Sequence, residues 1–125
     1  MTAASVLLCD DALFTRTILR GIVTAGGYEI VGEAENGRVA VEMYTQLRPD
    51  LVLMDMVMPE MGGLDAVRAI RAIDPNARIS MCSAMGQQML VDEALEAGAR
   101  GFITKPFNAS RVLEALADLA TAAPR

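Results

Sequence analysis

Five polar side chains each stand at the end of a short apolar run. They are three carboxylates, one hydroxyl and one ammonium, namely Asp10, Asp11, Asp55, Ser83 and Lys105. Three carboxylates in one pocket repel one another, which raises their pKa values unless a cation neutralises them. Oxygen ligands without a nearby histidine or thiolate suit a hard cation, and Mg²⁺ with retained waters is the usual choice. These residues predict a magnesium site, provided that the fold brings them together.

A carboxylate, a metal ion, an ammonium and a hydroxyl in one place suit phosphoryl transfer to an aspartate. In that reaction the carboxylate attacks phosphorus, while the metal ion and the ammonium spread the negative charge of the transferred group. The hydroxyl then hydrogen-bonds the phosphoryl oxygens of the product. Asp55 is the candidate nucleophile, because four apolar residues lead directly into it. An acid is rarely placed at the end of a buried strand unless it is paired or functional.

The apolar runs must be strands whose carboxyl ends meet at one edge of a sheet. We predict strands at 5–9, 28–34, 51–55, 78–82 and 101–104, and helices at 12–25, 37–47, 64–73, 87–97 and 109–120. Strands and helices that alternate with short connections are typical of a parallel sheet covered by helices on both faces. In such a right-handed sheet the carboxyl ends share one edge, where ligands bind. The fold class is therefore α/β, in a single domain.

Local signals mark where some helices begin and end. Asn36 and Asn108 are expected to cap the second and the last helix, and Gly26-Gly27 to end the first. Gly62-Gly63 is expected to loosen the loop that follows the central strand. The apolar positions of the first helix fall close to helical spacing, and they are Leu13, Ile18, Leu19, Ile22 and Val23.

Composition narrows the class of protein. The chain has 125 residues, 53% of them hydrophobic but only 4% aromatic, so its core must be aliphatic and rich in methionine. The net charge of −5 disfavours nucleic acid and anionic membranes as partners. The sequence has neither a transmembrane run nor a signal peptide, so we expect a cytoplasmic protein. A monomer is the expected oligomeric state.

Histidine is absent, and the two cysteines are expected to be free. The lack of histidine excludes histidine metal sites, Ser-His and Cys-His nucleophile pairs, and a role as a histidine phosphocarrier. Cys9 and Cys82 fall near the ends of predicted strands. If a third strand separates these two, they are ~9–10 Å apart, too far for a disulfide. Both are therefore predicted to be buried thiols.

The same residues resemble the response-regulator receiver family. The motifs are Asp10-Asp11, Asp55 followed by Met58-Pro59, Cys82-Ser83-Ala84 and Lys105-Pro106-Phe107, and the match covers essentially the whole chain, 1–125, with no output domain. The resemblance implies a flavodoxin-like, three-layer fold with five helices and a sheet of strand order 2-1-3-4-5. It also implies that a partner histidine kinase phosphorylates Asp55.

The resemblance further assigns roles to single residues. Mg²⁺ would be held by Asp11, Asp55 and the main-chain carbonyl of Val57, with Asp10 supporting through water. The remaining assignments are a switch hydroxyl, a switch aromatic that turns inward after phosphorylation, and a cis peptide bond before proline. They fall on Ser83, Phe102 and Lys105–Pro106, respectively.

The segment Met81–Gln87 is similar to stand-alone chemotaxis regulators, which signal to the flagellar motor. The expected protein is a phosphoacceptor that catalyses its own phosphorylation and slow dephosphorylation, and is otherwise not an enzyme. Its partners would be a histidine kinase, of the chemotaxis type, and a separate motor-switch or other signalling protein. Phe102 replaces the more frequent tyrosine of the family. Val57 and Met85, which flank the path of attacking water, are apolar, so slow self-hydrolysis is expected.

Other interpretations differ in class. A phosphorelay carrier would pass its phosphoryl group to the histidine of another protein. A small-molecule phosphatase with an aspartyl-phosphate intermediate usually has a second acid where this chain has Val57, and it needs a lid. A flavin-binding module is rejected, because Asp10-Asp11 in the first loop would repel phosphate. Two simpler interpretations stay open, namely Asp11 as a helix cap and Phe102 as core filler.

Overall fold

The apolar runs of the sequence form one parallel sheet. The computed structural model describes residues 3–121, in which strands and helices alternate along the chain. The strands are β1 (Ser5–Cys9), β2 (Glu29–Ala34), β3 (Leu51–Asp55), β4 (Ile79–Ser83) and β5 (Gly101–Thr104). The helices are α1 (Leu13–Ala25), α2 (Gly37–Leu47), α3 (Gly63–Ile73), α4 (Gln88–Ala97) and α5 (Ala109–Thr121). These bounds differ from the predicted ones by at most one residue at either end, which is the usual uncertainty of helix and strand termini.

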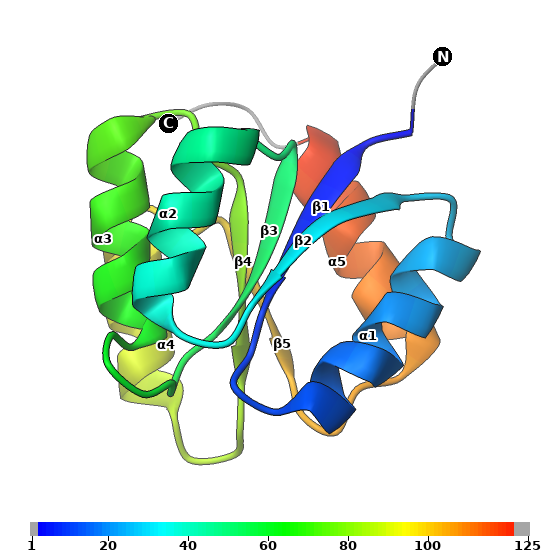
Figure 1. Cartoon of the computed structure of the whole chain (residues 1–125). Helices are drawn as coiled ribbons and strands as arrows, with labels where there is room; N and C mark the ends of the chain where they lie inside the picture. Colours follow the sequence, from blue (N-terminus) through cyan, green and yellow to red (C-terminus); the bar gives the residue numbers. More distant parts are fainter. Residues whose placement is uncertain (1–2, 122–125) are drawn as a thin grey trace.

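The strand order is β2-β1-β3-β4-β5, and all pairs are parallel. Helices α1 and α5 cover one face of the sheet, while α2, α3 and α4 cover the other (Figure 1). The predicted three-layer, flavodoxin-like fold is therefore confirmed. The register places Leu8 beside Leu53 and Asp55 beside Cys82. The carboxyl ends of the central strands consequently lie at one edge, at the bottom of Figure 1.

The core consists of two layers, one on each face of the sheet. Val6 and Leu8 of β1 point into the layer beneath α1 and α5. Leu7 and Cys9 point into the opposite layer, beneath α2 and α3. Because successive strand residues face opposite sides and both sides are covered, the central strands β1 and β3 are apolar on both faces. Burial of each large side chain contributes about 1.5–3 kcal/mol, which fixes the strand ends and the side chains that they carry.

Helix α1 departs from its predicted apolar pattern. Leu19 and Val23 are buried, whereas Leu13 is 65% and Ile18 is 40% exposed. The helix therefore packs through a narrower stripe than its sequence indicates, because α5 covers only one side of it. The predicted caps are confirmed in two helices: Asn36 Oδ1 accepts the amide of Val39 at 2.9 Å, and Asn108 caps α5 in the same way.

Cys9 and Cys82 are buried free thiols, as predicted, with β3 between their strands. Burial raises the pKa of both thiols, so both stay protonated at neutral pH. No helix within residues 3–121 is long and apolar enough to cross a membrane.

Candidate functional site

Three carboxylates meet at the carboxyl edge of the sheet. Because β1 and β3 are neighbours, Asp10 and Asp11 come to lie beside Asp55, and one oxygen of each lies within 4.8 Å of the others. Asp10 is 1% and Asp55 is 6% exposed, whereas Asp11 is at the surface. The three acids form a pocket that is closed at its base and open to solvent beside Asp11.

Lys105 bridges two of these acids. Its Nζ lies 3.2 Å from Asp10 Oδ2 and 3.2 Å from Asp55 Oδ1. The Lys105–Pro106 peptide bond is cis, and the amide of Lys105 donates to the Ser83 carbonyl at 2.7 Å. The end of β5 is thereby held against the end of β4, with the ammonium directed at the acids.

Asp10 is committed to contacts within the protein. Its Oδ1 accepts the amide of Ala12 at 2.9 Å, and its Oδ2 accepts from Lys105. Helix α1 begins after Ala12, and no side chain caps its first turn. The interpretation of Asp11 as a cap is therefore wrong, and the Asp11 carboxylate stays available to a ligand. Asp10 is placed to support the site from behind.

The surroundings of Asp55 oppose its ionisation. Burial first, and then the nearby carboxylate of Asp10, raise its pKa to about 6 from an ordinary value of 3.8. Lys105 acts in the opposite direction without cancelling these effects. Burial lowers the pKa of Lys105, but Asp55 and Asp10 outweigh it and the net effect is a raised pKa, so Lys105 stays an ammonium. The pocket therefore has an excess of negative charge that a cation would neutralise.

Ser83 ends β4, whereas Phe102 lies inside β5. Ser83 is 4% exposed, and its Oγ donates to the carbonyl of Ile103 over a long 3.5 Å. Phe102 pairs in register with Met81, earlier in β4 than Ser83, and is 40% exposed. Core filler is therefore the wrong interpretation of Phe102 in this conformation.

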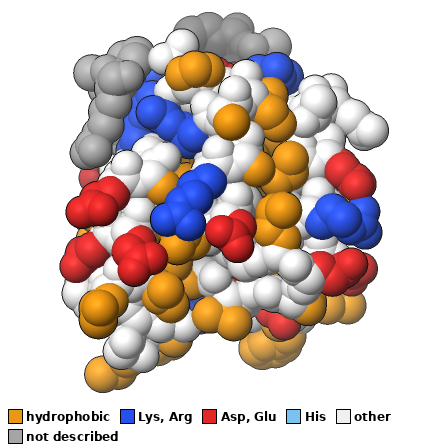
Figure 2. Space-filling view, turned by 90° about the vertical axis from the view of Figure 1, so that its left-hand side faces the viewer, with side chains coloured by type: hydrophobic (Ala, Val, Ile, Leu, Met, Phe, Trp, Pro, Cys, Tyr) orange, Lys and Arg blue, Asp and Glu red, His pale blue; other side chains and the backbone are white. Residues whose placement is uncertain are grey.

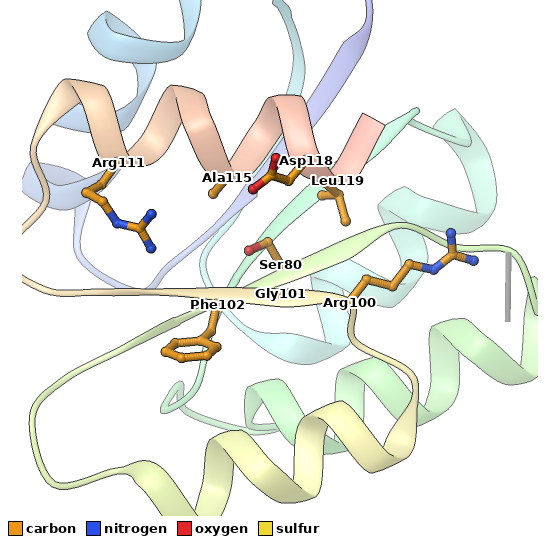
Figure 3. A pocket seen from close by; sticks show the side chains of 8 residues that line it. All are labelled: Ser80, Arg100, Gly101, Phe102, Arg111, Ala115, Asp118 and Leu119. Carbon is orange, nitrogen blue, oxygen red and sulfur yellow. The ribbon is translucent and has the colours of Figure 1, made fainter. Parts of the chain in front are cut away.

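The ring of Phe102 points away from α5, toward the side of the sheet that carries α4 (Figure 3). On the α5 side of β5 lies a pocket of about 100 Å³, whose lining residues are Ser80, Arg100, Gly101, Phe102, Arg111, Ala115, Asp118 and Leu119. This pocket is lined by none of the acids near Asp55. The residues that could carry out phosphoryl transfer therefore lie at the carboxyl edge of the sheet and not in this pocket.

The loop between β3 and α3 contains residues that the sequence interpretation misjudged. Gly63 donates its amide to Met56 O at 3.0 Å, and a Cβ on Gly63 would collide with the main-chain oxygen of Asp55. The expectation that Gly62-Gly63 loosens the loop is therefore wrong. Gly63 instead lets α3 pack directly against the end of β3, which fixes the backbone of Asp55. Val57, two residues after Asp55 in the same loop, is 57% exposed.

Comparison with known proteins agrees with this geometry. A model of the response regulator receiver domain matches residues 6–117. The chain belongs to the response-regulator receiver family. The receiver domain is 60% identical over 111 residues to the chemotaxis protein CheY of Thermotoga maritima, covering 89% of this chain and 92% of that protein. It is 54% identical over 114 residues to CheY of Bacillus subtilis, covering 91% and 95% of the two chains.

A solved structure gives the same fold. One chain of the CheX–CheY–BeF3–Mg²⁺ complex from Borrelia burgdorferi superposes with a TM-score of 0.92 and 35% sequence identity, covering 97% of this chain and 92% of that one. Receiver domains bind Mg²⁺ in an acidic pocket, and the carboxylates of Asp10, Asp11 and Asp55 fit such an ion. All of their ligand atoms are oxygens, as hard cations require, and one oxygen of each acid lies within 4.8 Å of the others.

Proposed function

We propose that this receiver domain is the phosphoacceptor of a two-component chemotaxis system. In this proposal a histidine kinase phosphorylates Asp55 in a reaction that depends on Mg²⁺, and the modification changes binding to a separate signalling partner. The main support is the arrangement of Asp55, which is buried, beside two further acids and in contact with an ammonium. A carboxylate that served only packing would not be kept in such a costly environment.

The residues of the pocket have distinct roles in this reaction. An oxygen of Asp55 attacks the phosphorus of a phosphohistidine, the phosphorus–nitrogen bond breaks, and the imidazole of the kinase leaves. Lys105 already contacts Asp55, so its ammonium can offset charge on the transferred oxygens. Mg²⁺, held by Asp11, Asp55 and the Val57 carbonyl with Asp10 acting through water, would neutralise further phosphoryl charge when bound.

Ser83 and Phe102 would convert phosphorylation into a change of surface. The long hydrogen bond from Ser83 Oγ is weak, so its hydroxyl can turn to a phosphoryl group on Asp55 at little cost. That movement would free space next to Ile103 and allow Phe102, now partly exposed, to turn inward. A local change in charge would thus shift the equilibrium between two forms of the surface around β5.

The surface near the site suits a protein partner. Hydrophobic side chains gather along the lower rim of the molecule, where the strands end (Figure 2). Met85 and Met89, which follow Ser83, are 87% and 79% exposed. Exposed methionines adapt easily to a partner surface. The likeness to chemotaxis proteins favours a partner at the flagellar motor over a phosphorelay. Val57 stands where aspartyl-phosphate phosphatases have their second acid, which favours a signalling protein over a metabolic enzyme.

Intact mass spectrometry after incubation with acetyl phosphate tests the proposal. We expect the wild type to gain one phosphoryl group with Mg²⁺ and none with a chelator. Asp55→Asn should gain none, whereas Asp65→Asn, the same change at an exposed position on α3, should behave like the wild type. Modification of the Asp55→Asn variant, or no modification of the folded wild type, would refute the proposal. Titration with a motor-switch protein then tests whether the phosphorylated form binds more tightly.

A further inference from the structure

The loop between β3 and α3, residues 56–62, is tied to the start of α2 by side chains and main chain. Glu60 adopts φ 65°, in the left-handed region, although it is not a glycine. A residue held in this region costs of order 1 kcal/mol and persists only where its contacts compensate. The contact here is with Asn36, whose Nδ2 donates to Glu60 Oε2 at 2.7 Å.

Asn36 uses both ends of its amide. Its oxygen caps α2 through the amide of Val39, and its nitrogen donates to the carboxylate of Glu60. Asn36 is 3% exposed, whereas the side chain of Glu60 is 58% exposed, so Asn36 holds the Glu60 carboxylate from its buried side. Arg38 Nε lies 3.7 Å from the other oxygen of Glu60 and holds the carboxylate from a second side. Hydrogen bonds to a charged group of this kind are stronger than neutral ones.

The main chain is joined at the same place. The amide of Gly37 donates to Met61 O at 2.8 Å, and a Cβ on Gly37 would collide with that oxygen. Because the loop starts directly after Asp55, its position determines where Val57 lies relative to the acids. If the loop were held only at its two ends, the main-chain carbonyl of Val57 would be more mobile.

We propose that Asn36 and Glu60 are positioning residues for the Mg²⁺-dependent phosphorylation of Asp55. Their hydrogen bond fixes the 56–62 loop, and with it the position of the Val57 carbonyl relative to the acidic pocket, before any ligand arrives. This inference rests on the proposed function, because it assigns a cause to the metal affinity of the same site. Misplacement of such a group by about 1 Å can cost on the order of 100-fold in rate.

A donor–acceptor exchange separates positioning from capping. Asn36→Asp keeps the cap of α2, because aspartate caps as well as asparagine, but it places a carboxylate against Glu60. In the double variant Asn36→Asp/Glu60→Gln the glutamine amide can donate to the aspartate, so the bond is rebuilt in the reverse direction. The double variant has the net charge of the wild type. Glu42→Gln, which removes another partner of Arg38 away from the loop, is the matched control.

The readouts are the Mg²⁺ dissociation constant from calorimetry, the phosphorylation rate with acetyl phosphate, and the urea midpoint. We expect Asn36→Asp to weaken Mg²⁺ binding and to slow phosphorylation about tenfold, equivalent to about 1.4 kcal/mol. The added negative charge alone would strengthen Mg²⁺ binding, so weakening cannot come from charge. The double variant should recover both quantities, and Glu42→Gln should change neither.

The inference would be overturned if Asn36→Asp changed neither the Mg²⁺ dissociation constant nor the phosphorylation rate. It would also be overturned if the double variant bound Mg²⁺ as weakly as Asn36→Asp. A lower urea midpoint with unchanged Mg²⁺ affinity would also overturn it, since that is the pattern of a purely structural contact. If the wild type is not phosphorylated at Asp55, the proposed function fails, and the Mg²⁺ constants still decide whether Asn36 and Glu60 position the loop.

Discussion

Replacing Asp55 by asparagine should stabilise the folded protein. Asp55 has a pKa of about 6 in the folded chain and an ordinary value of 3.8 when unfolded. At about 1.36 kcal/mol per pKa unit, its ionisation at pH 7 costs the folded state about 3 kcal/mol. Asp55→Asn removes this cost, which already includes the favourable effect of Lys105, and solvent screening at the open side of the pocket reduces it by about 1 kcal/mol. The free energy of unfolding should therefore rise by about 2 kcal/mol.

The pH dependence of this effect has a definite sign. Well below pH 3.8 Asp55 is protonated in both states, so the variant and the wild type should be about equally stable. As the pH rises toward 6 the unfolded chain ionises first, and the wild type loses stability relative to the variant. The difference in the free energy of unfolding between the two proteins should reach its full size once the pH is well above 6. A site placed for function thus works against the stability of the fold when no cation is bound.

Urea unfolding followed by circular dichroism, in a chelator and between pH 4 and pH 8, measures this difference. The exposed Asp65→Asn change should stay within about 0.5 kcal/mol of the wild type at every pH. Added Mg²⁺ should stabilise the wild type more than Asp55→Asn, because an ion bound only to the folded state shifts the equilibrium. An Asp55→Asn variant that is no more stable than the wild type at pH 7, or a gap that does not change with pH, would refute the electrostatic reasoning.

Three further changes test other parts of the structure. Tyr44→Phe removes a 2.7 Å hydrogen bond from a buried hydroxyl to Asp74, and the urea midpoint should fall by an amount equivalent to about 1.5 kcal/mol; an unchanged midpoint would contradict the bond. Gly63→Ala brings a methyl group against the Asp55 carbonyl, so the free energy of unfolding should fall by about 2–3 kcal/mol. An unchanged free energy of unfolding would mean that the loop moves aside without cost. Val57→Asn places a polar group where water approaches the phosphorylated residue, and the lifetime of the phosphorylated form, followed by intact mass, should shorten severalfold; an equal lifetime would show that the apolar side chain does not slow hydrolysis.

The sequence alone determined the sheet and the residues at its active edge. Runs such as 51–54 are apolar throughout, which is typical of a strand covered on both faces. Parallel connection then forces the polar residues that end these strands onto one edge, whatever the details of packing. The caps at Asn36 and Asn108 were predictable for a similar reason, because a cap bonds an amide only three residues away.

Only the tertiary structure decided what depends on contacts between distant segments. The burial of Leu19 and the exposure of Ile18 are set by where α5 lies, which the pattern of α1 does not contain. The close approach of Gly63 to the Asp55 carbonyl is invisible in a sequence where Gly-Gly usually indicates a loose loop. The hydrogen bond between Asn36 and Glu60 joins residues 24 positions apart, across two elements. Local patterns specify which residues reach the site, and long-range packing specifies how firmly they are held there.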